Sequence, residues 1–211
     1  KVISTPDAIF PSDNEYGIPT RDLELDAKYV DAPVRAWGVE ARNARMRGTY
    51  HFYRDDYKFS SLWANPKPVV QSKCVAIIEP NFSTSESEPM ASALYQIYRK
   101  RWLSRYWQTK GIRTVVDLHV ADRWQDLNLL GVPKGWTTYA TRGSDDTLEQ
   151  VICEAHVGIR HAQGAKVSMV VIGGATKIKQ LCYRKRWIWV PAPRQTGFKI
   201  SEHFNATAKA V

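Results

Sequence analysis

Basic and aromatic residues are concentrated between residues 98 and 111, where their side chains have the chemistry to bind phosphates or unpaired bases. At helical spacing Tyr98, Trp102 and Tyr106 share one face, and Arg101 and Arg105 lie along its edge. Guanidinium groups bind phosphate through paired hydrogen bonds, and aromatic rings stack on bases. The segment predicts a nucleic-acid interface whose contacts are Arg99, Arg101, Trp102, Arg105 and Tyr106. A core face whose arginines pair with carboxylates inside the fold would have the same pattern.

A second basic and aromatic cluster begins at Arg184, Lys185 and Arg186. These three cations would extend the positive surface and are further candidate contacts for nucleic acid. The residues that follow alternate as in a strand, so Trp187 and Trp189 would share one face. The alternative is therefore that the tryptophans seal the end of a sheet.

Polar residues that follow two predicted strands could bind a divalent metal. Glu79 ends one apolar run, and Asp117 and His119 end another. In parallel α/β folds such groups gather beyond the carboxyl ends of strands, where carboxylates suit hard cations and imidazole suits transition metals. With a bound water, such a site would hydrolyse a phosphodiester. Ordinary polar contacts are the alternative, because strand alternation puts Asp117 and His119 on one face, where they could pair.

The segment Gly173 to Lys177 lies between a predicted strand and a predicted helix, where backbone N–H groups could bind an anion. Its glycine spacing matches neither the phosphate-loop consensus nor the dinucleotide fingerprint. A tight turn would use the same residues. No G-x-S-x-G motif and no cysteine nucleophile signature is present, so acyl transfer has no support.

Five apolar runs of strand length alternate with helical segments, and these elements must position the candidate binding and metal-ligating side chains. The runs cover residues 74–79, 112–120, 136–141, 167–172 and 186–190, and the helices cover 86–110, 146–163 and 177–183. This alternation predicts an α/β fold with a mostly parallel sheet of about five strands, either an open sheet or a partial barrel. The polar, proline-interrupted residues 1–50 predict an irregular arm packed on one domain at 51–195, with a tail at 196–211.

Composition favours a soluble protein with a polyanionic partner. The 211 residues are 44% hydrophobic, enough for one core, and the formal net charge of +9 favours nucleic acid or another phosphate-rich ligand. Three separated cysteines without a C-x-x-C pair indicate neither a disulfide framework nor a thiolate zinc site, so a reducing cytoplasm is expected. No apolar run reaches about 18 residues, so no membrane partner is expected.

Several separate stretches carry a resemblance to a known family. They are His51 to Phe59, Pro80 to Ser83, Tyr98 to Gly111 and Gly131 to Lys134. From His51 onward the chain resembles domain-of-unknown-function family forty-four seventeen, a bacterial family found largely in prophages, plasmids and other mobile elements. The resemblance implies replication, DNA handling or host interaction rather than metabolism. Asn81, Asp117 and His119 depart from the family pattern, so the resemblance implies no shared metal site.

Three functions follow as hypotheses, and catalysis is left open. The first is a mobile-element accessory protein of the bacterial cytoplasm that binds nucleic acid, or a nucleoprotein assembly, without a cofactor. The second is a metal-dependent phosphodiesterase or nuclease centred on Glu79, Asp117 and His119. The third is a protein-interaction or virion-associated component that contacts other proteins of a mobile-element assembly. Binding that weakens steeply with salt would favour the first, and metal-dependent cleavage would favour the second.

Overall fold

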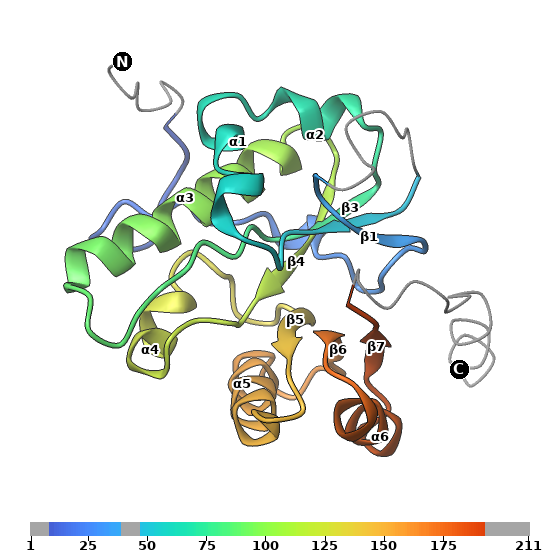
Figure 1. Cartoon of the computed structure of the whole chain (residues 1–211). Coiled ribbons are helices and arrows are strands. Elements are labelled where there is room, and N and C mark those ends of the chain that lie inside the picture. The colour runs from blue at the N-terminus through green and yellow to red at the C-terminus, as the bar shows by residue number, and fades with distance from the viewer. Residues whose placement is uncertain (1–8, 39–46, 193–211) are drawn as a thin grey trace.

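The computed structural model describes residues 9–38 and 47–192, so the predicted tail at 196–211 lies outside the described residues. In this part of the chain the centre is a sheet of seven parallel strands (Figure 1). The strands are β1 (Val34–Ala36), β2 (Thr49–His51), β3 (Ala76–Ile78), β4 (Arg113–Asp117), β5 (Thr138–Gly143), β6 (Ser168–Gly173) and β7 (Ile188–Val190). The predicted α/β fold with a mostly parallel sheet is confirmed, and the sheet is larger than the five strands expected.

The strands follow one another in the sheet in chain order, and the sheet curls until it is nearly barrel-shaped (Figure 1). Right-handed crossovers, the rule for parallel neighbours, put the helices on one face and turn the other face inward. An interior cluster of apolar side chains takes residues from β1 and from β3 to β7, namely Val34, Ile78, Val115, Ala140, Val170, Ile172, Ile188 and Val190. The partial barrel, rather than the open sheet, is therefore the form that this chain adopts.

Helices cover the outer face of the sheet. In the described residues they are α1 (Ser61–Ala64), α2 (Lys67–Gln71), α3 (Met90–Gln108), α4 (Gln125–Asn128), α5 (Leu148–His161) and α6 (Thr176–Lys185), with short 3-10 helices η1 (Leu23–Leu25), η2 (Asp56–Lys58) and η3 (Asp122–Trp124). Helices α1 to α3 cover one apolar cluster, around Phe52, Trp63 and Trp107. Helices α5 and α6 cover a second cluster, around Tyr139 and Val171. The three long predicted helices correspond to α3, α5 and α6.

The predicted irregular arm, residues 1–50, contains β1 and the first two residues of β2. Each of these strands has three residues, too few to show a strand period in the sequence. Residues 9–33, which we call the N-terminal segment, precede them. Ala27 and Val30 of this segment belong to the interior cluster, and the N–H of Ala27 donates to the carbonyl of Thr114 over 3.1 Å. Because Thr114 lies near the start of β4, the N-terminal segment packs against the amino end of the barrel.

Candidate functional site

Because all strands of the sheet are parallel, the segments that connect strands and helices lie at two opposite ends of the barrel. Residues that lead into a strand lie at the amino end, and residues that leave a strand lie at the carboxyl end. Exposed cations gather in the first group. We call their surface the basic end, which is made by Arg47, Lys73, Lys110, Lys134, Lys166, Arg184, Lys185 and Arg186. Residues far apart in the sequence thus share one end of the molecule.

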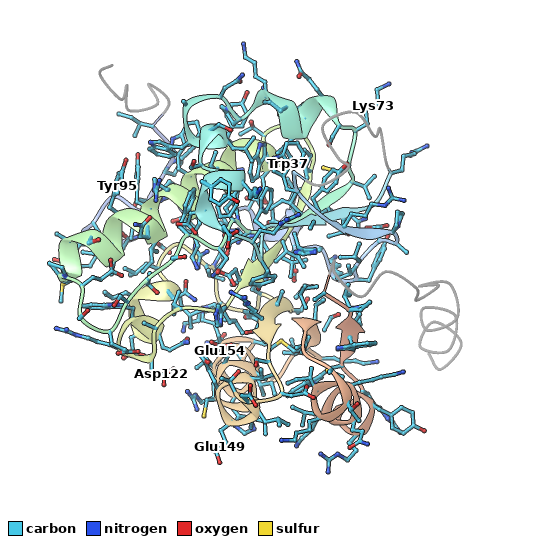
Figure 2. All side chains as sticks on the ribbon, viewed as in Figure 1. Trp37, Lys73, Tyr95, Asp122, Glu149 and Glu154 are labelled. Atoms are coloured by element: carbon cyan, nitrogen blue, oxygen red, sulfur yellow. The ribbon has the colours of Figure 1, made fainter. Side chains whose placement is uncertain are left out.

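Negative charge is concentrated at the opposite end. Exposed acidic residues that leave strands are Asp55, Glu86, Asp122, Asp126 and Asp146. Figure 2 shows the labelled side chains of Lys73 and Asp122 on opposite sides of the molecule. Near the basic end, two acidic residues of the N-terminal segment are already paired, Asp22 with Arg105 at 3.8 Å and Asp31 with Arg113. The two ends therefore differ in charge.

The end of α6 is the most exposed part of the basic end. Tyr183 is 83% exposed, and the three cations that follow it are exposed as well. Arg186 adopts a left-handed backbone conformation with φ 56°, and its N–H donates to carbonyls of the last helical turn. Arg184, Lys185 and Arg186 form no ion pair with any residue that the structure describes. Trp187 is partly buried against the cluster under α5 and α6, as expected of a ring that seals the sheet.

The predicted nucleic-acid contacts on helix α3 fall into two groups, one buried in the interior and one at the surface. Arg101 is fully buried, pairs with Glu79, and donates from Nε to the carbonyl of Leu130 over 3.0 Å. Trp102 is 3% exposed and stacks on the ring of Tyr106 with centroids 5.5 Å apart. A nucleic acid lying on the surface of this fold would not reach Arg101 or Trp102. These two residues have the core role that the alternative interpretation gives them.

The other predicted contacts on α3 are partly exposed. Arg99, in the middle of the helix, lies over the ring of Phe82 at 3.9 Å. Arg105 and Tyr106 lie in the last turns, and Nζ of Lys110 is 5.6 Å from the centroid of the Tyr106 ring. The carboxyl end of α3 therefore adds the ring of Tyr106 and the guanidinium of Arg105 beside the basic end.

Glu79 follows β3 and is buried between two arginines. Arg21 and Arg101 each pair with one of its oxygens, and the backbone N–H of Asp117 donates to it over 3.0 Å. Burial opposes ionisation of Glu79, but the two guanidinium groups outweigh burial and hold its pKa below the usual value. The carboxylate is thus an anion that the fold itself neutralises.

Asp117 ends β4 and accepts four hydrogen bonds. One oxygen accepts from the hydroxyl of Tyr53 at 2.8 Å and from the backbone N–H of His119 at 3.0 Å. The other accepts from the amide of Asn81 and the ammonium of Lys100, each at 3.0 Å. Both oxygens are therefore occupied by groups of the protein. Among the residues that the structure describes, no group of three or more His, Cys, Asp or Glu is arranged to hold a metal ion.

His119 pairs with a residue that sequence reasoning missed. Its Nδ1 lies 3.2 Å from Oε1 of Glu154 on α5, and the other oxygen of Glu154 accepts from the hydroxyl of Thr141 on β5. Burial lowers the pKa of His119, but the hydrogen bond and charge of Glu154 outweigh burial and raise it. Figure 2 shows Glu154 on the side of α5 near the sheet and Glu149 on the far side of the same helix. No local sequence signal links the pair, because the two residues are 35 positions apart.

The candidate anion site before α6 is occupied by a side chain of the protein. The carboxylate of Asp145 accepts from the backbone N–H groups of Ala175 at 2.7 Å, Lys177 at 3.1 Å and Ile178 at 3.2 Å. These bonds hold the pKa of Asp145 below its usual value, although desolvation acts in the opposite direction. The glycines before α6 therefore form a turn whose donors are satisfied internally.

Comparison with known proteins associates the chain with phages. The model of a family described as a domain of unknown function (DUF4417) matches residues 10–154. Two curated relatives are "Gene 1 protein" of Mycobacterium phage D29, 38% identical over 112 residues, and "Gene 1 protein" of Mycobacterium phage L5, 33% identical over 111 residues. Each alignment covers 50% of this chain, but only 40% of the D29 protein and 47% of the L5 protein. The chain thus spans less than half the length of these relatives.

No solved structure matches the chain. Within the described residues, no helix combines the length and the apolar character that crossing a bilayer requires.

Proposed function

We propose that this chain, which belongs to the DUF4417 family, is a phage-associated protein that binds nucleic acid through its basic end. Phosphate contacts from lysines and arginines would supply most of the affinity, so the interaction would depend little on base sequence. The acidic carboxyl end of the barrel would face away from the nucleic acid.

One observation carries the proposal. The exposed run at the end of α6 presents Arg184, Lys185 and Arg186 together, and none of them pairs with a described carboxylate. From residue 155 to residue 192 the chain has no Asp or Glu, and its basic residues are Arg160, Lys166, Lys177, Lys179, Arg184, Lys185 and Arg186. The three exposed cations at the end of α6 would attract a polyanion and release its counterions on binding.

Aromatic rings beside the cations support contact with unpaired bases. Tyr183 precedes the cations of α6, and Tyr106 lies beside Lys110 at the end of α3. A base that stacks on either ring would place its phosphates near the neighbouring lysine or arginine. Arg101 and Trp102 have no part in this interface, because they are buried.

Fluorescence anisotropy with labelled single-stranded and duplex DNA and RNA tests the proposal. The test variant is Arg184→Gln with Lys185→Gln. The control is Lys58→Gln with Lys177→Gln, which removes the same charge from the carboxyl end. Measured between about 50 mM and about 200 mM salt, the test variant should lower the salt slope of binding by about 1.4 for single strands or about 1.8 for duplex DNA, and the control should not.

Two results would count against the proposal. One is the absence of binding at the lower salt concentration. The other is an equal loss in the test variant and the control, which would indicate attraction by net charge alone. Electrophoresis of the recovered strands, with magnesium or manganese added, also tests the nuclease alternative. Intact strands are expected, since Glu79 and Asp117 are already engaged by Arg21, Arg101 and Lys100.

A further inference from the structure

The carboxyl end of the barrel interior is polar on one side and apolar on the other. Strand alternation places Tyr53 and Asp117 on the interior face with Ile78 and Val115, which belong to the interior cluster. The same alternation puts His51 on that face, two residues before Tyr53. Across the barrel, the interior cluster supplies Ile172 and Val190, and Arg142 lies in register with Ile172. Polar groups beside an apolar wall are the usual lining of a small-ligand site.

Three aromatic rings form a row along the polar side. The ring centroids of His51 and Tyr53 are 6.0 Å apart, and those of Tyr53 and His119 are 6.4 Å apart. Tyr53 is fixed by its hydrogen bond to Asp117, so the ring that both imidazoles pack against is held in place. The row therefore has little freedom to rearrange.

Two buried nitrogen atoms in this region have no hydrogen-bond partner among the residues that the structure describes. His51 is 2% exposed, yet its Nδ1 forms no hydrogen bond. Nη1 of Arg54, three residues later, is also buried without a partner. Buried polar groups are almost always hydrogen-bonded, because an unmade bond costs free energy. A ligand that accepts from both groups would satisfy them.

His119 offers a third group to the same region. Glu154 engages its Nδ1, and its Nε2 forms no hydrogen bond with a described residue, while the side chain is 25% exposed. A buried carboxylate on one imidazole nitrogen fixes the ring and presents the other nitrogen as a donor when the ring is protonated. Arg142 follows Thr141, the residue that donates to Glu154, and its positive charge opposes the rise in the pKa of His119.

The available groups select for an oxyanion. Arg54, Arg142 and a protonated His119 donate hydrogen bonds and carry positive charge, whereas Asp117 has both oxygens occupied by other donors. Of the acidic residues nearby, Asp56 is turned to the backbone N–H and hydroxyl of Ser83, at 3.1 Å and 2.9 Å. Three cationic donors match the charge and geometry of a phosphate group better than those of a carboxylate.

From this geometry we infer that the carboxyl end of the barrel binds a small phosphate-bearing ligand between His51, Arg54, His119 and Arg142, with Glu154 as the residue that positions His119. The inference does not rest on nucleic-acid binding by the basic end, because the two sites lie at opposite ends of the barrel. The phosphate could come from free phosphate, from a mononucleotide or from the 5′ end of a strand.

The test follows the histidine side-chain NMR signals of the full chain during titration with inorganic phosphate, adenosine monophosphate and a 5′-phosphorylated oligonucleotide. We expect saturable shifts for His51 and His119 with at least one of these probes. His156, exposed on α5, is the internal control and should not shift. The probe with the highest affinity identifies the source of the phosphate.

Variants make the inference falsifiable. Arg54→Gln and Arg142→Gln should each weaken binding about tenfold, the usual effect of losing one charge-assisted hydrogen bond. Glu154→Gln should weaken it by releasing His119, and Glu149→Gln, on the far side of the same helix, should have no effect. The Arg184→Gln, Lys185→Gln variant should retain phosphate binding even if nucleic-acid binding is lost. Absence of saturable shifts with all three probes, or unchanged affinity in both arginine variants, would overturn the inference.

Discussion

Two arginines one helical turn apart on α3 have different roles. Arg101 is enclosed by Glu79 and by backbone carbonyls, whereas Arg105 is partly exposed and lies 3.8 Å from Asp22. An exposed ion pair gains little free energy because water screens it, but a buried carboxylate that loses a cation is left uncompensated. The burial of each residue, not its type, decides its contribution.

Replacing Arg101 should therefore cost far more than replacing Arg105. Arg101→Met should lower the free energy of unfolding by about 3–5 kcal/mol, because Glu79 would keep only Arg21 as a partner. Arg105→Met should lower it by less than about 1 kcal/mol. Urea unfolding followed by circular dichroism measures both. Equal effects would show that the buried pair adds no more than the exposed one.

Buried histidines should make the fold sensitive to acid. Burial lowers the pKa of His51 to about 3 and that of His161 to about 4. In the unfolded chain both titrate near a pKa of about 6.5, so below that pH the unfolded state binds protons that the folded state does not. The free energy of unfolding should fall as the pH drops from about 6.5 towards about 4, by at most about 1.4 kcal/mol per pH unit for each histidine.

A variant separates this effect from that of other groups. His119 acts in the opposite direction, since its raised pKa favours the folded state as the pH falls. His51→Gln should therefore show a shallower loss of stability with acid than the parent chain. Urea unfolding at several pH values between about 6.5 and about 4 gives both slopes. Parallel curves for the two proteins would contradict the assignment of His51 as a neutral, buried group.

The sequence indicates which residues of the candidate site lie at strand ends, but not their partners. Strand length and apolar runs place Glu79, Asp117 and His119 at the carboxyl ends of two strands, and in the structure Glu79 follows β3, Asp117 ends β4 and His119 follows β4. Their partners come from elsewhere, with Arg21 in the N-terminal segment and Glu154 on α5. Pairing across such separations depends on tertiary packing, which no local pattern encodes.

At the scale of elements, buried strands and long helices are the predictable part. The runs at 74–79 and 167–172 are continuous and apolar because both faces of a parallel strand are covered. The helix expected at 86–110 is observed as α3, Met90–Gln108. Strands β1 and β2 have three residues each, and their place in the sheet is set by pairing of β2 with β3 and of β1 with β2. Their own side chains carry no pattern that would reveal it.

The docking of the N-terminal segment on the barrel can be tested with two glycines. Gly131 and Gly135 have φ values of 73° and 83°, so alanine is strained at both. A Cβ at Gly131 would collide with the carbonyl of Pro19, whereas a Cβ at Gly135 would have nothing within 4 Å. Gly135→Ala should cost about 1–2 kcal/mol from backbone strain alone. Gly131→Ala should cost more, because the N-terminal segment must shift.

Thermal unfolding of the two variants measures this difference. The shift of the N-terminal segment in Gly131→Ala should also weaken the hydrogen bond from the backbone N–H of Arg21 to the carbonyl of Gly131, which is 2.9 Å long. Limited proteolysis should therefore cut the N-terminal segment faster in Gly131→Ala than in Gly135→Ala. Identical melting and identical cleavage would indicate that the segment is not held at this point.

At the scale of the whole molecule, one interior connects the two outer clusters. The interior cluster includes side chains from the first and the last strand of the sheet, so neither half of the barrel retains it alone. The cluster under α1 to α3 contains Trp63 and Trp107, and the cluster under α5 and α6 contains Trp136. Loss of either outer cluster would expose the shared interior.

The chain should therefore unfold in a single cooperative transition. Urea curves from tryptophan fluorescence and from far-ultraviolet circular dichroism should coincide, because all parts of the sheet depend on one interior. Replacing Trp136 by Phe, and separately Trp63 by Phe, should leave the two curves superimposed while reducing the share of the fluorescence that comes from the cluster of the replaced residue. Two separated transitions would show that the halves of the barrel are independent folding units.

The separation of charge along the barrel makes this molecule an electric dipole. The exposed lysines and arginines of the basic end lie opposite the exposed acidic residues Asp55, Glu86, Asp122, Asp126 and Asp146, and each of these two groups complements the partial charges of the helix ends beside it. In the field of a polyanion such a molecule experiences a torque before it makes any contact. The protein would approach the polyanion with its basic end facing it, so that a larger share of encounters would have the orientation that binding requires. Added salt would then slow association first, by screening this long-range alignment.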